Sequence, residues 1–77
     1  MEEEVKHVII LHNDDVHTFD FVIDCLIEIC GHTLEQAEQC TFLVHFKGKC
    51  EVKTGSWEEL IPMNNALLHK GLSSEIV

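Results

Sequence analysis

A dense polar cluster, His12-Asn13-Asp14-Asp15-Val16-His17, follows directly after an apolar run near the N-terminus. A carboxylate only accepts hydrogen bonds, an amide both donates and accepts, and a neutral imidazole does one with each ring nitrogen. Together such groups suit an ammonium ion, which has three protons to donate. Asn and Asp also form solvated turns, because their side chains bond nearby backbone N–H groups. The cluster therefore predicts either an ammonium-binding site or an Asx-capped turn.

A second residue that could do chemistry is His45, whose apolar neighbours predict that it is partly buried. Its ring is then either a core histidine bonded to the backbone or a hydrogen-bond acceptor in a semi-apolar site. Cys40, His45 and Cys50 are spaced at fives, which matches no zinc-binding pattern. Nothing indicates an oxyanion hole or a third group that orients a Cys–His pair. We therefore expect no metal, no cofactor and no catalytic activity.

The first half of the chain shows the sequence signals of one strand and two helices. Residues 8–11 form a β-branched run that suits a strand buried largely on both faces. Thr18 is a suitable N-cap for a helix over residues 19–30, whose apolar side chains recur at spacings of three and four. Thr33 and Gln36 form a capping box, which predicts a second helix over residues 34–46.

The second half is predicted to add two strands and a helix. Residues 50–54 alternate in polarity and residues 72–77 form a last strand. Pro62 conflicts with one helix beginning at residue 57, so we expect a short turn before a helix that starts near Pro62, or a kink. The order β-α-α-β-α-β predicts an α+β fold, with a three-stranded antiparallel sheet and three helices on one face.

Size and charge narrow the functional classes. The 77 residues make one domain, 1–77, with a short tail at 1–5. The net charge of −9 disfavours binding to nucleic acid and to anionic membranes. No apolar run approaches the ~20 residues of a membrane span, and the acidic N-terminus is unlike a secretion signal. We expect a cytoplasmic protein whose four cysteines are reduced thiols, buried or half-buried.

Two motifs resemble the signature of the ClpS adaptor family. The first is Asn13-Asp14-Asp15, followed after four residues by Asp20-Phe21-Val22-Ile23-Asp24-Cys25-Leu26. The second is Val44-His45-Phe46-Lys47-Gly48-Lys49. The resemblance covers roughly residues 7–54. It implies a ClpS-like adaptor domain that binds proteins with a large hydrophobic N-terminal residue, the N-degron. Such an adaptor delivers them to a Clp AAA+ protease, through the N-terminal domain of the unfoldase.

The resemblance also implies roles for particular residues. The substrate's free α-amino group would be held by Asn13, Asp14 and His45, with Asp15 supporting the site. The side-chain pocket would be lined by the residues at six matching positions: Leu11, Phe19, Val22, Thr41, Val44 and Leu72. Phe19 and Thr41 stand where the family commonly has methionine or another apolar gate residue. Where the family has Thr-Pro-Met after the acidic turn, this chain has His17-Thr18-Phe19.

An alternative interpretation keeps the fold and changes the function. The stretch from Lys49 to Leu72 is shorter than usual for the family, and only about six residues precede the first strand. The chain would then be a non-enzymatic protein–protein interaction module with a different partner and a disused N-degron pocket.

Overall fold

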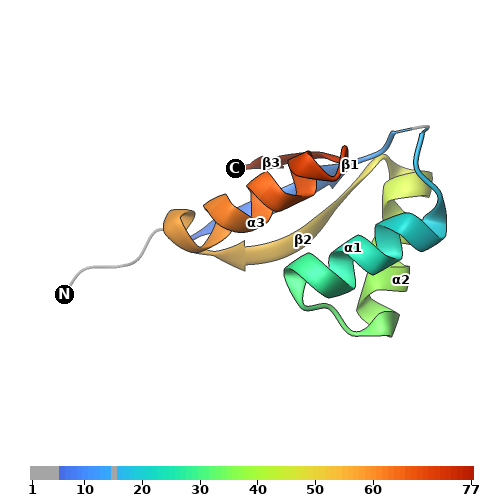
Figure 1. The fold of residues 1–77 in the computed structure, drawn as a ribbon, viewed down its shortest axis with the longest axis horizontal. Coiled ribbons are helices and arrows are strands. Elements are labelled where there is room, and N and C mark those ends of the chain that lie inside the picture. The colour runs from blue at the N-terminus through green and yellow to red at the C-terminus, as the bar shows by residue number, and fades with distance from the viewer. Residues whose placement is uncertain (1–5, 15) are drawn as a thin grey trace.

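The computed structural model describes residues 6–14 and 16–77, so the predicted tail at 1–5 lies outside the described residues. Three strands and three helices follow one another in the predicted order (Figure 1). They are β1 (His7–His12), α1 (Phe19–Cys30), α2 (Leu34–Lys47), β2 (Lys49–Gly55), α3 (Trp57–His69) and β3 (Ser73–Ile76). The predicted α+β class and element order are confirmed.

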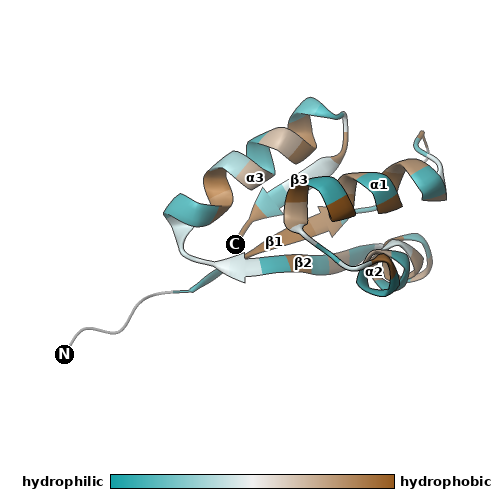
Figure 2. Ribbon diagram, turned by 60° about the horizontal axis from the view of Figure 1, so that its bottom comes forward, coloured by the Kyte–Doolittle hydropathy of each residue, from teal (hydrophilic) through white to brown (hydrophobic). Residues whose placement is uncertain are grey.

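The three strands form one antiparallel sheet in the order β2-β1-β3. Ile9 and Leu11 of β1 point into the core, whereas Val8 and Ile10 are only half-buried. The prediction of a strand buried on both faces is therefore wrong. The reason is visible in Figure 2, where α1 and α3 lie over the same side of the sheet. A β-bulge between Ile9 and Ile10 shifts the pairing with β2.

Side-chain caps determine where the first two helices begin. The Thr18 hydroxyl accepts a hydrogen bond from the Phe21 N–H at 3.2 Å, and α1 has the predicted bounds. Thr33 and Gln36 make the predicted reciprocal capping box at the start of α2. Both predictions are confirmed, and α2 continues one residue beyond its predicted end.

The third helix differs from the prediction of a separate turn before Pro62. A capping box of Ser56 and Glu59 starts α3, which then runs through Pro62 to His69 as one helix. Proline has no N–H to donate to the carbonyl of Glu58, so one backbone bond is missing. Leu60 and Leu67, before and after the proline, are both buried in the core. Burial of apolar residues on both sides of Pro62 offsets the local cost.

One hydrophobic cluster joins all the elements except β3, whose Ile76 packs against its edge. The predicted burial of the cysteines is confirmed: three are buried, Cys40 is half-buried, and all four are free thiols. The burial of Cys30 raises the pKa of its thiol to about 11. These thiols therefore pack as small hydrophobic groups.

A glycine closes α2 and links it to the end of β1. Gly48 has a φ of 92°, and its N–H bonds to the Val44 carbonyl at 3.1 Å. Its own carbonyl accepts a hydrogen bond from the Asn13 N–H at 2.9 Å. The acidic loop after β1 is thereby tied to the C-terminal end of α2.

We predict that Gly48→Ala destabilises the fold by about 1–2 kcal/mol, because a Cβ is disfavoured in this left-handed conformation. No atom lies within 4 Å of the added carbon, so the loss of stability would come from backbone strain alone. Urea unfolding measures the change. Gln39→Ala, on the exposed surface of α2, is the control and should shift stability by less than about 0.5 kcal/mol. Equal effects of the two substitutions would contradict the prediction.

Candidate functional site

A small cavity lies where the end of β1, the start of α1, the end of α2 and the turn before β3 meet. Its volume is about 10 Å³, roughly the space for one water molecule. Side chains from all four segments line it: Leu11, His12, Asn13, Asp14, His17, Val22, Val44, His45 and Leu72. Seven of the ten predicted site residues are therefore brought together around one cavity.

The floor of the cavity is apolar and part of the core. Leu11, Val22, Val44 and Leu72 are all buried and belong to the hydrophobic cluster. The remaining lining residues are polar and come from the last residue of β1, the β1–α1 loop and the last turn of α2. The cavity thus has an apolar end and a polar rim, which is the arrangement of a site that orients an amphiphilic ligand.

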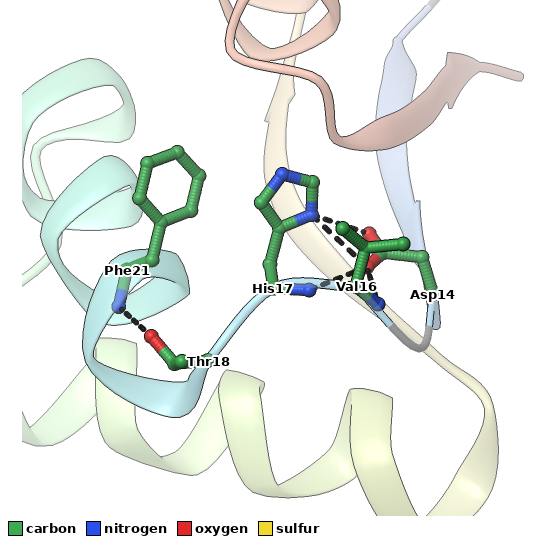
Figure 3. A network of polar contacts seen from close by, with 5 residues as sticks. All are labelled: Asp14, Val16, His17, Thr18 and Phe21. Carbon is green, nitrogen blue, oxygen red and sulfur yellow. Dashed lines mark hydrogen bonds and ion pairs between the residues drawn. The ribbon is translucent and has the colours of Figure 1, made fainter.

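Asp14 is held by the loop that follows it. Its carboxylate accepts hydrogen bonds from the Val16 N–H at 2.9 Å and the His17 N–H at 3.0 Å. The ring of His17 places Nδ1 at 3.0 and 3.1 Å from the two carboxylate oxygens (Figure 3). An ionised carboxylate only accepts, so His17 Nδ1 carries a proton and donates.

These contacts set the ionisation of Asp14. Partial burial is the largest single influence and raises its pKa, but the bonds from Val16 and His17 together outweigh it. The pKa of Asp14 consequently lies below its ordinary value of 3.8. The carboxylate is therefore charged at neutral pH.

His17 is a site residue that the sequence did not predict. Its ring stacks on Phe21 with centroids 4.8 Å apart and planes at 17°. A carbon added at Gly71 would meet its Nε2 at 3.2 Å, so the ring also reaches the turn before β3. The sequence signal that could have indicated His17 was its place in the polar cluster, at a position where the ClpS signature has threonine.

His12 also lines the cavity without having been predicted as a site residue. Its Nε2 lies 2.8 Å from the Glu75 carboxylate, which joins the end of β1 to β3. One ring nitrogen of His12 is therefore engaged in holding the sheet together. Its position directly after Leu11 in the strand was the signal that could have indicated a wall of the site.

His45 lies at the lip of the cavity and is exposed, so the prediction of partial burial is wrong. Its ring packs against Phe19, the first residue of α1, with centroids 4.1 Å apart. Because α1 begins at Phe19, it does not cover α2 beyond this point, and the ring of His45 is left exposed. The ring remains accessible to a ligand arriving from solvent.

The two predicted gate residues do not line the cavity. Phe19 is 38% exposed and packs against His45 and Phe42. Thr41 is fully buried, and its hydroxyl donates to the Ala37 carbonyl at 2.7 Å within α2. Asp15, predicted to support the site, lies outside the described residues.

The described part of the chain offers neither a metal cluster nor a membrane-spanning helix. Residues 6–14 and 16–77 contain no group of three His, Cys, Asp or Glu side chains placed to hold a metal ion. Within the same residues, no helix has the length and apolar character needed to cross a membrane. The cavity at the end of β1 is the one that brings the predicted site residues together.

The fold defines a small α+β domain with a cavity at the end of its central strand. Its sequence matches the family model described as "ATP-dependent Clp protease adaptor protein ClpS" over residues 2–75. The ClpS adapter protein of Nitratidesulfovibrio vulgaris is 36% identical, over 90% of this chain and 72% of the relative. That of Oleidesulfovibrio alaskensis is 36% identical, over 97% of this chain and 75% of the relative. The ClpS adapter of Campylobacter jejuni is 42% identical over 62% of this chain and half of its own length.

The chain belongs to the ClpS family of Clp protease adaptors. The resemblance inferred from the two motifs is confirmed.

We predict that Asp14→Asn destabilises the fold at neutral pH by roughly 0.5–1.5 kcal/mol, through loss of charge-assisted hydrogen bonds. The folded-state pKa is lowered, so this contribution is present above about pH 3.8 and is lost as the pH falls further. Urea unfolding of both proteins between about pH 7 and pH 3 tests it. A difference in stability that stays constant to the lowest pH would argue against an ionised Asp14 as its source.

Proposed function

We propose that this chain binds proteins through a free N-terminus whose first residue is large and hydrophobic, and delivers them to a Clp AAA+ protease. The observation that carries the proposal is the cavity itself. Asn13, Asp14 and His45 form its rim beside a floor of buried apolar side chains. An N-terminal residue has the matching chemistry, an ammonium ion directly attached to an apolar side chain.

The rim can satisfy an ammonium ion. Asp14 supplies a charged acceptor, Asn13 an amide oxygen, and His45 a ring nitrogen that accepts when the ring is neutral. Each hydrogen bond to a charged group contributes about 1.5–3 kcal/mol, and burial of a Phe-sized side chain adds about 1.5–3 kcal/mol. After the costs of ordering and desolvation, binding near micromolar, about −8 kcal/mol, is expected.

Membership of the adaptor family supports the delivery half of the proposal. The unfoldase N-terminal domain would be the second partner, in the cytoplasm, and the chain would itself catalyse nothing. A net charge of −9 favours partners with basic surfaces over nucleic acid or anionic membranes.

We predict micromolar binding of peptides that begin with Phe, Leu or Trp, because the α-ammonium and the apolar side chain are recognised together. Fluorescence anisotropy titration measures it. The control is the same peptides acetylated at the N-terminus, which removes the charge and two of the three protons. Equal binding of the acetylated peptides, or no binding of any peptide by any variant, would refute N-terminal recognition.

We predict that His45→Ala weakens binding of the Phe peptide by about tenfold or more, because one acceptor for the ammonium is lost. His45 is exposed, so its removal should leave unfolding in urea nearly unchanged. His69→Ala, at the exposed end of α3, is the matched control and should bind as wild type does. Unchanged affinity of His45→Ala would remove this residue from the clamp.

A second candidate function is a protein–protein module of the same fold with a disused pocket. The observation that favours it is the small cavity, which as it stands does not admit a large side chain. Capture of a Clp unfoldase by a chain with Asn13 and His45 both replaced, without binding to free N-termini by the wild type, would favour this function.

A further inference from the structure

The cavity is far too small for the ligand that its chemistry fits. About 10 Å³ is the space of a single water molecule, whereas an aromatic side chain carries a ring of at least six non-hydrogen atoms. Some lining group must therefore move before a large first residue can enter. The four floor residues belong to the hydrophobic cluster and cannot move without disturbing the core.

His17 is the lining residue that is placed to move. It lies in the loop between β1 and α1, outside both elements, and its side chain retains 19% exposure. Its ring spans the cavity from Asp14 on one side to the backbone at Gly71 on the other. Gly71 precedes Leu72, a floor residue, so the ring of His17 reaches the segment that supplies part of the apolar floor.

His17 also occupies the acceptor that the ammonium ion needs. Its Nδ1 donates to both oxygens of the Asp14 carboxylate, at 3.0 and 3.1 Å. The two backbone N–H groups of Val16 and His17 hold the same carboxylate independently of the ring. Removal of the ring would thus leave Asp14 oriented by these two backbone bonds, with the acceptor sites that the ring now occupies left free (Figure 3).

We propose that His17 determines the specificity of the pocket by acting as a side-chain gate. Resting on the proposed function above, the imidazole both fills the space for the first side chain and competes with the α-ammonium for Asp14. The competition affects every N-terminus alike, because every free N-terminus carries the same ammonium ion. The steric part penalises large first residues more than small ones, because only large ones require the ring to leave Gly71.

The test compares His17→Ala, His17→Phe and wild type with peptides that begin with Phe or with Val. His17→Ala should bind the Phe peptide about fivefold or more tightly than wild type, and the ratio of Phe to Val affinity should rise. His17→Phe keeps a ring in the cavity and removes the donor, so its ratio should stay at or below that of wild type. His69→Ala is the control for loss of an exposed histidine and should leave both affinities unchanged.

The ratio of Phe to Val affinity distinguishes a gate from a residue that only supports the structure of the loop. If His17→Ala changes both affinities equally, or lowers both while peptide binding persists, the gate is refuted and N-terminal recognition stands. If neither wild type nor any variant binds a free N-terminus, the proposed function itself fails.

A second measurement uses the wild type alone, so it holds even where His17→Ala folds poorly. The NMR signals of the His17 ring should shift when the Phe peptide saturates the protein, because the ring leaves Asp14 and Gly71. The signals of His69 serve as the reference. Unchanged His17 signals at saturation would overturn the gate.

Discussion

The hydrogen bond from the Asn13 N–H to the Gly48 carbonyl decides where the two halves of the site meet. It extends the antiparallel pairing of β1 and β2 one step past His12 and Lys49, the last paired residues. Gly48 can accept this bond because its left-handed backbone ends α2 and turns the chain into β2. His45 lies in the last turn of α2 and is therefore placed beside the acidic loop. A single backbone junction thus makes one cavity from two sequence motifs.

The second constraint is that a partly buried carboxylate needs donors whether or not a ligand is present. Asp14 takes two of them from backbone N–H groups and one from the ring of His17. The backbone donors are fixed by the fold of the loop, whereas the ring donor can rotate away. The free protein therefore keeps Asp14 ionised and satisfied. In the proposed binding step, an ammonium ion would replace one donor, the ring of His17, by another. Such an exchange costs less than ordering a loose loop.

Much of this fold could be predicted because local signals agreed with the final packing. The caps at Thr18 and Thr33 and the apolar spacing gave the bounds of α1 and, within one residue, of α2. Pro62 could not be placed, because whether a helix tolerates proline depends on the burial of its neighbours. The β-branched run likewise could not show that the second face of β1 is only half-buried, since the arrangement of the helices decides which face is covered.

The site was predictable where the local sequence decides a residue's neighbours, and not where the packing of a distant segment does. Thr41 and His45 lie one turn apart on α2, yet Thr41 is buried and His45 is exposed. The difference arises because α1 covers the middle of α2 and begins beside its end. The ring of His17 could equally have faced solvent. Its contact with Gly71 depends on a turn more than fifty residues later in the sequence, which no local pattern reports.

The contrast between the buried floor of the cavity and the loop residue His17 also affects how the specificity of the proposed pocket could change in so small a domain. Leu11, Val22 and Leu72 serve the hydrophobic core and the pocket at once. A chain of 77 residues buries a modest fraction of its surface, so a cavity opened among these residues removes a large share of its stability. His17 contributes to the pocket from a loop and is absent from that core. Under the proposed function, substitutions at His17 would therefore alter which first residue enters, while the floor that receives it would stay constrained by folding.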